Sequence, residues 1–433
     1  MQPRFPSCSV QRRTKCRRHA MKVCALALFA TSLLLASGHP QTAIALKAQS
    51  DFARVESAPR PRIPDAEDCM QSQAAALAVS PPEERPLLYY RKGYCAFAGA
   101  ATTRDPRQFL AAAAEFDKAI EAWPEGARKS AKHVAPEPVP GVLRVFAAIA
   151  RLHAAAGGAV PGGARQDLAA ALASPACNSY PMPAAFCGEL RSAGAQWLGW
   201  FALLDNQPDQ ALRHFSAAPS SGWAAWARGR REFDAATYGS AAAQYAQAID
   251  RWKQMWQGDG PTLSQALGPK PQYAAALADW GGARLLAGDL PGAILSLDAS
   301  IQADSSPHAL FLRARARELA GQMDAALTDY NLASRTAFAI ARDLASGEAH
   351  LYRGIVLFRR RDFARAEEEF SSALNFEMTG ALRPDARAWR HLAAVAGGSC
   401  GSSRQSLDLA LAAVSPYFPQ AEARSLALAC GGV

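Results

Sequence analysis

Apolar residues recur at helical spacing along almost the whole chain after its first 45 residues. No run of alternating β-branched residues is present that would predict a strand. Turn signals interrupt the helical pattern at regular intervals, at Asn206-Gln207-Pro208, Gly288-Asp289, Gly321-Gln322 and Gly397-Gly398. The sequence therefore predicts an all-α chain of short antiparallel helices.

One fixed spacing is superimposed on this pattern. A small residue is followed by Ala 12 positions later, by a large side chain after four more, and by a small one after three more. The sets are Gly199, Ala211, Phe215 and Ala218; Gly229, Ala241, Tyr245 and Ala248; Gly281, Ala293, Leu297 and Ser300; Ala314, Ala326, Tyr330 and Ala333; and Gly354, Ala366, Phe370 and Ala373. Small residues let paired helices approach, and the large side chain fills the remaining space. A generic helical bundle is the alternative, but it needs no fixed period.

These residues resemble the tetratricopeptide repeat, a helix-turn-helix unit of about 34 residues. The resemblance is strongest over residues 192–380. An earlier copy contains Gly93, Ala112, Phe116 and Ala119, a weaker one Leu152, Ala164, Leu168 and Ala171, and a degenerate one starts near Ala386. The resemblance implies a right-handed superhelical solenoid of about seven to eight repeat units, closed by a C-terminal capping helix over residues 419–430.

The first 45 residues have the three parts of a signal peptide. Seven Lys and Arg residues precede or adjoin an apolar run over residues 23–35, and a small-x-small cleavage site follows at residues 43–45. We therefore expect an exported protein, periplasmic or secreted, with an uncleaved membrane anchor as the alternative. Either Met1 or Met21 can serve as the start, and residues 17–18 loosely resemble a twin-arginine signal, so the export route stays open.

Removal of this segment changes the charge of the chain. The full sequence has 47 Lys+Arg against 38 Asp+Glu, a net charge of +9. Residues 1–45 carry seven of the basic residues and no acidic one, so their removal lowers +9 to +2. A nearly neutral chain has no electrostatic footprint for nucleic acid. We therefore expect no nucleic-acid partner, and no membrane partner after signal cleavage.

Six of the nine cysteines lie beyond the signal, in three close pairs. An even count in an exported chain predicts disulfide bonds. Nearest-neighbour pairing joins Cys69 to Cys95, Cys177 to Cys187, and Cys400 to Cys430. A metal site is the rival interpretation, but no C-x-x-C motif is present and the histidines are scattered.

The irregular stretches divide the mature chain. Prolines at positions 59, 61 and 64 make residues 46–66 an expected flexible tether. Divergent helical repeats then occupy residues 67–190, regular repeats residues 191–382, and a degenerate repeat with the capping helix residues 383–433. Proline and glycine clusters predict loops over residues 125–141 and 257–272.

No catalytic constellation is apparent. The chain has no H-E-x-x-H, no G-x-S-x-G and no phosphate-binding glycine loop. The carboxylate run Glu367-Glu368-Glu369 points in successive directions around a helix, which is typical of a solvated face. We therefore expect no enzymatic activity, no cofactor and no metal.

The resemblance implies a concave groove lined by the first helix of each repeat. The positions that match the family's groove are Trp200, Trp223, Trp226, Arg230, Phe233, Phe311, Arg315, Phe358 and Arg359. Aromatic residues and Arg are the types that dominate protein-binding hot spots. Burial in the core is the alternative for Trp223 and Trp226, because tryptophan buries a large area.

The resulting prediction is an exported tetratricopeptide-type scaffold that binds protein or peptide partners in its groove, without catalysis. A family mode that clamps a C-terminal carboxylate with Lys and Asn is disfavoured, since no Asn falls at a lining position. The alternatives are an enzyme or glycan-binding protein on a helical-repeat scaffold, and a membrane-anchored component of envelope assembly.

Overall fold

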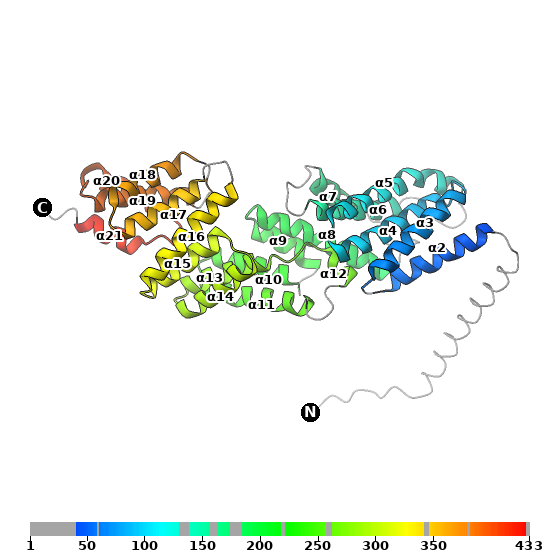
Figure 1. Ribbon diagram of the computed structural model, residues 1–433, viewed down its shortest axis with the longest axis horizontal. Helices are drawn as coiled ribbons and strands as arrows, with labels where there is room; N and C mark the ends of the chain where they lie inside the picture. Colours follow the sequence, from blue (N-terminus) through cyan, green and yellow to red (C-terminus); the bar gives the residue numbers. More distant parts are fainter. Residues whose placement is uncertain are drawn as a thin grey trace, which may run out of the picture. The chain divides into compact units, whose positions relative to one another are not determined.

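The computed structural model describes residues 40–58, 60–129, 138–155, 163–173, 184–217, 221–256, 262–341, 346–376, 378 and 382–429. These residues form 20 α-helices and one 3-10 helix, without a strand, as the sequence predicts (Figure 1). The helices are α2 (Pro40–Ser57), α3 (Ile63–Val79), α4 (Arg85–Thr103), α5 (Pro106–Lys129), α6 (Pro138–Ala154), α7 (Ala164–Ala173), α8 (Ala184–Leu204), α9 (Pro208–His214), η1 (Phe215–Ala217), α10 (Gly222–Asp234), α11 (Tyr238–Trp256), α12 (Leu263–Leu267), α13 (Tyr273–Leu286), α14 (Leu290–Ala303), α15 (Pro307–Leu319), α16 (Met323–Ala341), α17 (Gly347–Arg359), α18 (Phe363–Leu374), α19 (Leu382–Ala396), α20 (Gly401–Ala410) and α21 (Gln420–Ala429).

The chain forms two compact units. Unit 1 contains residues 1–198 together with residues 261–269, and unit 2 contains residues 199–260 and 270–433. Each unit is a series of antiparallel helical hairpins in which sequence neighbours pack together. The regular repeats and the C-terminal part, which we expected as separate regions, thus form one unit. Most of the predicted signal peptide, residues 1–39, lies outside the described residues.

The expected flexible tether is instead largely helical. Helix α2 includes residues 46–57, and its buried face consists of Ala48, Asp51, Phe52 and Val55. The rings of Phe52 and Tyr94 on α4 lie 5.6 Å apart, edge to face. The sequence-based expectation gave weight to the prolines, but these follow the helix. The three-four spacing of the buried positions is what favours the helix.

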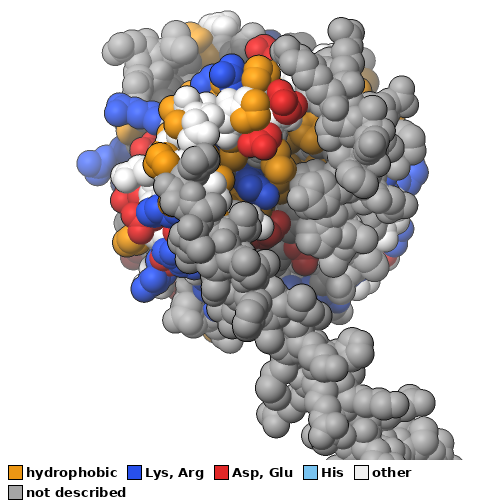
Figure 2. All heavy atoms as spheres, turned by 90° about the vertical axis from the view of Figure 1, so that its right-hand side faces the viewer, with side chains coloured by type: hydrophobic (Ala, Val, Ile, Leu, Met, Phe, Trp, Pro, Cys, Tyr) orange, Lys and Arg blue, Asp and Glu red, His pale blue; other side chains and the backbone are white. Residues whose placement is uncertain are grey.

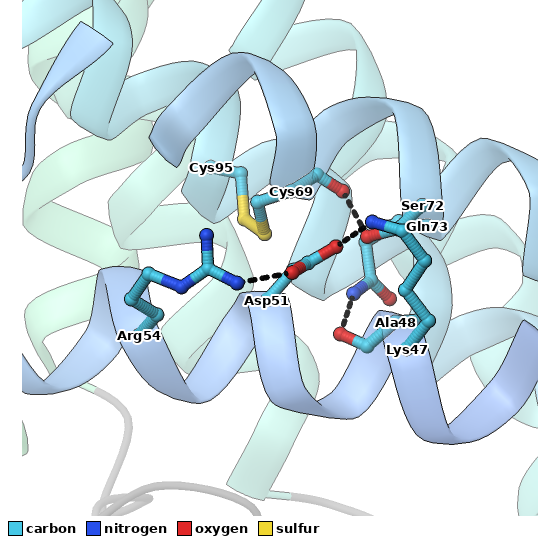
Figure 3. The surroundings of a disulfide bond; sticks show 8 residues. All are labelled: Lys47, Ala48, Asp51, Arg54, Cys69, Ser72, Gln73 and Cys95. Carbon is cyan, nitrogen blue, oxygen red and sulfur yellow. Dashed lines mark hydrogen bonds and ion pairs between the residues drawn. A yellow bond between two sulfur atoms is a disulfide. The ribbon is translucent and has the colours of Figure 1, made fainter. Parts of the chain in front are cut away.

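Polar contacts also fix α2 in unit 1 (Figure 3). Asp51 is only 3% exposed and pairs with Lys47 at 2.6 Å and with Arg54 at 2.7 Å. Gln73 of α3 donates a hydrogen bond of 2.6 Å to the backbone carbonyl of Ala48. Those two ion pairs lie within α2, whereas the hydrogen bond from Gln73 and a further pair of Arg54 with Asp65 of α3, at 3.4 Å, connect α2 to its neighbour, so residues 46–57 belong to the folded unit.

The predicted disulfide between Cys69 and Cys95 is confirmed, and it joins α3 to α4 beside Asp51 (Figure 3). Cys400 is disulfide-bonded as well. Its predicted partner Cys430 lies outside the described residues, as does Cys177, and the side chain of Cys187 is likewise not described.

The predicted cleavage site at residues 43–45 lies inside α2, where Ile44 packs against the cluster of Ala48, Ala76 and Leu88. Within the described ranges, no helix is both long and apolar enough to cross a bilayer. One face of the molecule is shown in Figure 2, where basic and acidic side chains are interspersed among hydrophobic ones in the coloured part.

Part of the loop that we expected over residues 257–272 is also ordered. It contains the short helix α12, whose last carbonyl, that of Leu267, accepts a hydrogen bond of 2.9 Å from the indole of Trp197. The same carbonyl lies 3.3 Å from Nε2 of His153, whose ring stacks on Phe109. Burial lowers the pKa of His153 to about 4. This insertion therefore packs into unit 1.

In unit 2, the same turn closes hairpin after hairpin. A residue with positive φ follows the first helix at Asn206, Ala236, Gly288, Gly321, Arg361 and Gly398. In each case the next backbone N–H bonds to the carbonyl five residues earlier, as in Asp289 to Arg284 at 2.9 Å. This is the Schellman arrangement that ends helices. It sends each second helix back along the first.

Candidate functional site on the first-helix face of unit 2

The spacing that defines the repeats corresponds to close contact inside each hairpin. A Cβ added to Gly229 on α10 would lie 2.5 Å from the ring of Tyr245 on α11, and one added to Gly354 would lie 2.5 Å from Phe370. Gly199 faces Phe215 and Gly281 faces Leu297 in the same way. The large side chain thus lies on the small residue of its own hairpin. The packing residues are buried throughout: Gly199, Ala211, Phe215, Gly229, Ala241, Tyr245, Gly281, Ala293, Ala326, Tyr330, Gly354, Ala366 and Phe370.

The fold is a tetratricopeptide-like helical repeat. No protein-family model matches the chain, and no curated protein does either. Among solved structures, it is similar to a tetratricopeptide repeat protein from Parabacteroides merdae, at 11% identity and a TM-score of 0.37, over 66% of this chain and 98% of that one. It is also similar to a chain of the APC/C hetero-tetramer Cut9–Hcn1, at 12% identity and a TM-score of 0.41, over 93% of this chain and 94% of that one. The third is yeast Tom70, which is 12% identical, with a TM-score of 0.35, over 85% of this chain and 86% of that one.

The first helices of the repeats in unit 2 are α10, α13, α15, α17 and α19; eight of the nine residues that the resemblance assigns to a groove lie on α10, α15 and α17, and Trp200 lies on α8. We call the common surface of these first helices the first-helix face. Five of the nine predicted residues are buried, at 2–7% exposure: Trp223, Trp226, Phe311, Arg315 and Phe358. Trp200, Arg230 and Phe233 are partly exposed, and Arg359 is partly exposed as a residue although its side chain is only 9% exposed. The structure therefore places the five buried side chains away from solvent, which for Trp223 and Trp226 is the core alternative, and their neighbours explain why.

The two tryptophans of α10 belong to the core. Trp223 packs against Trp252 of α11, with ring centroids 5.2 Å apart, and Trp226 lies 5.5 Å from Trp223. The indole N–H of Trp226 donates a hydrogen bond of 2.7 Å to Asp279 on α13. Trp226 thus links two neighbouring repeats, which is a structural role.

Phe311 is buried between repeats as well. Its ring stacks on that of Tyr352, which lies on the next first helix, α17, with the ring centroids 5.3 Å apart. Phe358 lies edge to face with Trp389 on α19, with the ring centroids 5.2 Å apart. These side chains join successive first helices, so they are core residues of the stack.

The remaining cover comes from the chain's own end. We call residues 411–429, which include α21, the C-terminal segment. The expected capping helix over residues 419–430 corresponds to α21, and it contacts α19 and α20 of the last hairpin. The residues just before α21, however, extend along the first-helix face well beyond that hairpin.

Tyr417 reaches furthest. Its hydroxyl lies only 2.5 Å from the position that a Cβ on Gly282 of α13 would take, so a larger residue there would clash with it. Its ring is 6.2 Å from that of Phe233 on α10, and its carbonyl accepts a hydrogen bond of 3.2 Å from Arg315 on α15. Burial raises the pKa of the Tyr417 hydroxyl. One residue of the segment therefore contacts three successive first helices.

Ser415 and Phe418 attach the segment to α19. The backbone N–H and the hydroxyl of Ser415 both donate to Asp385, at 2.7 and 2.6 Å. Asp385 is 2% exposed, and burial raises the pKa of its carboxyl. Phe418 is 5% exposed and packs edge to face on Trp389.

Glu422 completes a row of four alternating charges, Arg315, Glu318, Arg359 and Glu422, on the first-helix face beneath the C-terminal segment. Arg315 pairs with Glu318 at 2.6 Å, Glu318 pairs with Arg359 at 2.6 Å, and Arg359 pairs with Glu422 at 2.5 Å. The side chains of Arg315, Glu318 and Arg359 are 8–9% exposed. Two buried cations thus match two carboxylates, one of which the C-terminal segment supplies.

Sequence reasoning identified this face but not its occupant. Glu318 matches a lining position of the family's groove, but Asp385 and Gly282 were not among the predicted residues. A second glycine directly after the packing residue Gly281 is the signal that could have revealed Tyr417, because Gly282 has no role inside the hairpin. Among the described residues, no cluster of His, Cys, Asp and Glu is arranged to hold a metal ion.

Proposed function

We propose that this protein is an exported scaffold that binds polypeptide partners on the first-helix face of unit 2. The observation that carries the proposal is that this face already holds a polypeptide. The C-terminal segment is bound there through aromatic rings, a buried carboxylate and an ion pair. Such a mixture of aromatic anchors and desolvated polar pairs is typical of peptide-binding sites.

Export is part of this proposal. It rests on the basic start, the apolar run and the small-x-small site of the first 45 residues. The disulfide between Cys69 and Cys95 supports it, because stable disulfides are characteristic of oxidising compartments. We expect a mature chain that begins at Leu46 in the periplasmic or secreted fraction. N-terminal sequencing of that material tests the expectation, and an intact N-terminus in the membrane fraction would favour the anchored alternative.

The buried carboxylates of the face favour binding over catalysis. Asp385 accepts two hydrogen bonds from Ser415, and Glu318 is held by two arginines and by the hydroxyl of Tyr330 at 2.8 Å. A carboxylate that serves as a general acid or base must be free to meet a substrate. These two are saturated by the protein itself, which is a structural arrangement.

Site-specific photo-cross-linking tests the proposal. Leu319 ends α15 on the first-helix side and is 56% exposed, whereas Leu295 on the second helix α14 is 69% exposed. A photoreactive residue at position 319 is expected to capture polypeptides in cells, and the matched residue at position 295 is not. Equal capture at both positions, or none at position 319, would contradict binding on this face.

A further inference from the structure

We infer that the first-helix face recognises short peptides with the pattern of residues 415–422, and that the chain's own C-terminal segment occupies the site until such a peptide displaces it. The inference rests on the proposed function and specifies its partner. The pattern is a hydroxyl residue, then two adjacent aromatics within a proline-bounded turn, then an acidic residue.

The reach of the segment distinguishes an occupant from a cap. A cap needs to cover only the last hairpin, α19 and α20. Residues 415–422 instead contact five first helices, from Phe233 on α10, through α13, α15 and α17, to Trp389 on α19. Gly282 leaves room for Tyr417 three hairpins before the end of the stack. The face is therefore shaped for a peptide that runs along it.

The first requirement on any occupant comes from Asp385. This carboxylate is buried, and both of its oxygens accept hydrogen bonds from Ser415. Without those donors it would be a buried charge lacking its partners, which is strongly unfavourable. A replacement must therefore bring a backbone N–H together with a serine or threonine hydroxyl.

The second requirement is a pair of aromatic rings that diverge. A backbone hydrogen bond of 3.1 Å from the N–H of Phe418 to the carbonyl of Ser415 closes a turn, with Pro416 at its second position. The turn directs Tyr417 toward Gly282 and Phe418 onto Trp389. Proline on either side of the aromatics limits the alternative conformations of a free peptide and so lowers the cost of ordering it.

The third requirement is a negative charge. If Glu422 leaves, the buried side chains of Arg315 and Arg359 share the single carboxylate of Glu318. The row of charges then has one uncompensated positive charge, which an incoming carboxylate relieves. The acidic residue belongs four positions after the second aromatic, as Glu422 follows Phe418.

Beyond these anchors and the predicted bond of Cys400 to Cys430, helix α21 adds a modest apolar contact, in which Leu426 is partly buried against the core of unit 2. Its buried residues are the two small ones, Ala423 and Ala427, while Leu428 is 71% exposed. A covalently linked occupant competes at an effective concentration of roughly millimolar, so an external peptide binds weakly until the linked one is loosened. Loosening the segment should therefore reveal the affinity of the face.

The test uses a fluorescent synthetic peptide of residues 411–429 and the full chain. In the chain, Tyr417→Ala combined with Glu422→Gln removes two anchors, and Leu428→Ala is the matched control on the exposed side of α21. We expect the doubly substituted chain to bind the peptide at least about tenfold more tightly than the wild type or the control. A peptide with the same two substitutions should not bind. Equal affinity for all three chains, with each chain folded by circular dichroism, would overturn the inference.

A second measurement covers the case in which the doubly substituted chain does not fold. Excess unlabelled peptide is added to wild-type chain carrying ¹⁵N, and hydrogen exchange of the chain's own residues 411–423 is followed by mass. Displacement predicts faster exchange in that region alone. Unchanged exchange at saturating peptide would overturn the inference.

Two other outcomes separate this inference from the proposed function. Capture at position 319 without peptide binding would leave the scaffold proposal intact and refute the recognition pattern. A concentration-dependent dimer of the wild type, lost in the doubly substituted chain without peptide binding, would assign the face to the segment of a second copy and also refute it.

Discussion

The contact between Gly229 and Tyr245 permits a sharp test of the repeat packing. Replacement of Gly229 by Ala adds one methyl group to the middle of α10. That Cβ would lie 2.5 Å from the ring of Tyr245, which is 1% exposed and so has no open space into which to move. The hairpin must therefore open slightly, or the ring must leave its preferred rotamer.

The magnitude follows from two opposing effects. Overpacking of a dense core costs about 1–3 kcal/mol. Alanine is better than glycine inside a helix by about 1 kcal/mol, which offsets part of that cost. The hairpin of Ala314 and Tyr330 shows that the fold accommodates alanine at this position where the helices allow it. We therefore expect a net loss of up to about 2 kcal/mol in the free energy of unfolding relative to the wild type, and a loss of about 1–3 kcal/mol relative to a glycine-to-alanine change in a helix without a close contact.

The assay is urea-induced unfolding followed by circular dichroism, with Gly239→Ala as the matched control. Gly239 lies in the first turn of α11, and a Cβ there would meet nothing within 4 Å. The control should be as stable as the wild type or slightly more stable. If Gly229→Ala were as stable as the Gly239→Ala control, the close-packing explanation of the repeat would be refuted.

Three further predictions concern unit 1 and the tryptophan cluster. Replacement of both Cys69 and Cys95 by Ser should lower the free energy of unfolding of unit 1 by about 3 kcal/mol, measured by urea unfolding under oxidising conditions. In reduced samples, the wild type and the variant should be equally stable. Because the pKa of His153 is about 4 when folded and near 6.5 when unfolded, stability should be complete above pH 6.5 and should fall by about 3 kcal/mol toward pH 4. His153→Asn should flatten that pH profile, and an unchanged profile would count against burial. Trp226→Ala should lower the free energy of unfolding by about 3–5 kcal/mol, as expected of a core residue. A variant that is as stable as the wild type but binds partners less well would instead indicate that Trp226 lines an open groove.

The periodic part of the fold could be predicted from sequence because its cause is local. Each packing residue such as Gly354 meets Phe370 within one hairpin, so a fixed spacing in sequence reports a fixed contact in space. The pairing of Cys69 with Cys95 was accessible for the same reason, since both lie in neighbouring helices. Helix α2 was mistaken for a tether because its few buried positions, Phe52 among them, are outweighed in sequence by the prolines that follow.

The occupant of the first-helix face could not be predicted, because its contacts join residues far apart in the chain. Tyr417 meets Gly282, and Arg359 meets Glu422, across separations that no repeat spacing encodes. The resemblance located the lining positions by analogy with an open groove. In this chain the same positions are covered, so Phe311 and Phe358 contribute to stability rather than to an open binding surface.

The most direct test of the central claim is hydrogen exchange of the C-terminal segment in the wild-type chain. The backbone N–H of Ser415 donates to Asp385, and that of Phe418 closes the turn. Both should exchange much more slowly than in the isolated peptide of residues 411–429, and the combined substitutions Tyr417→Ala and Glu422→Gln should reduce the difference. Exchange of these amides at the rate of the free peptide in the intact chain would contradict occupation of the face by the chain's own end.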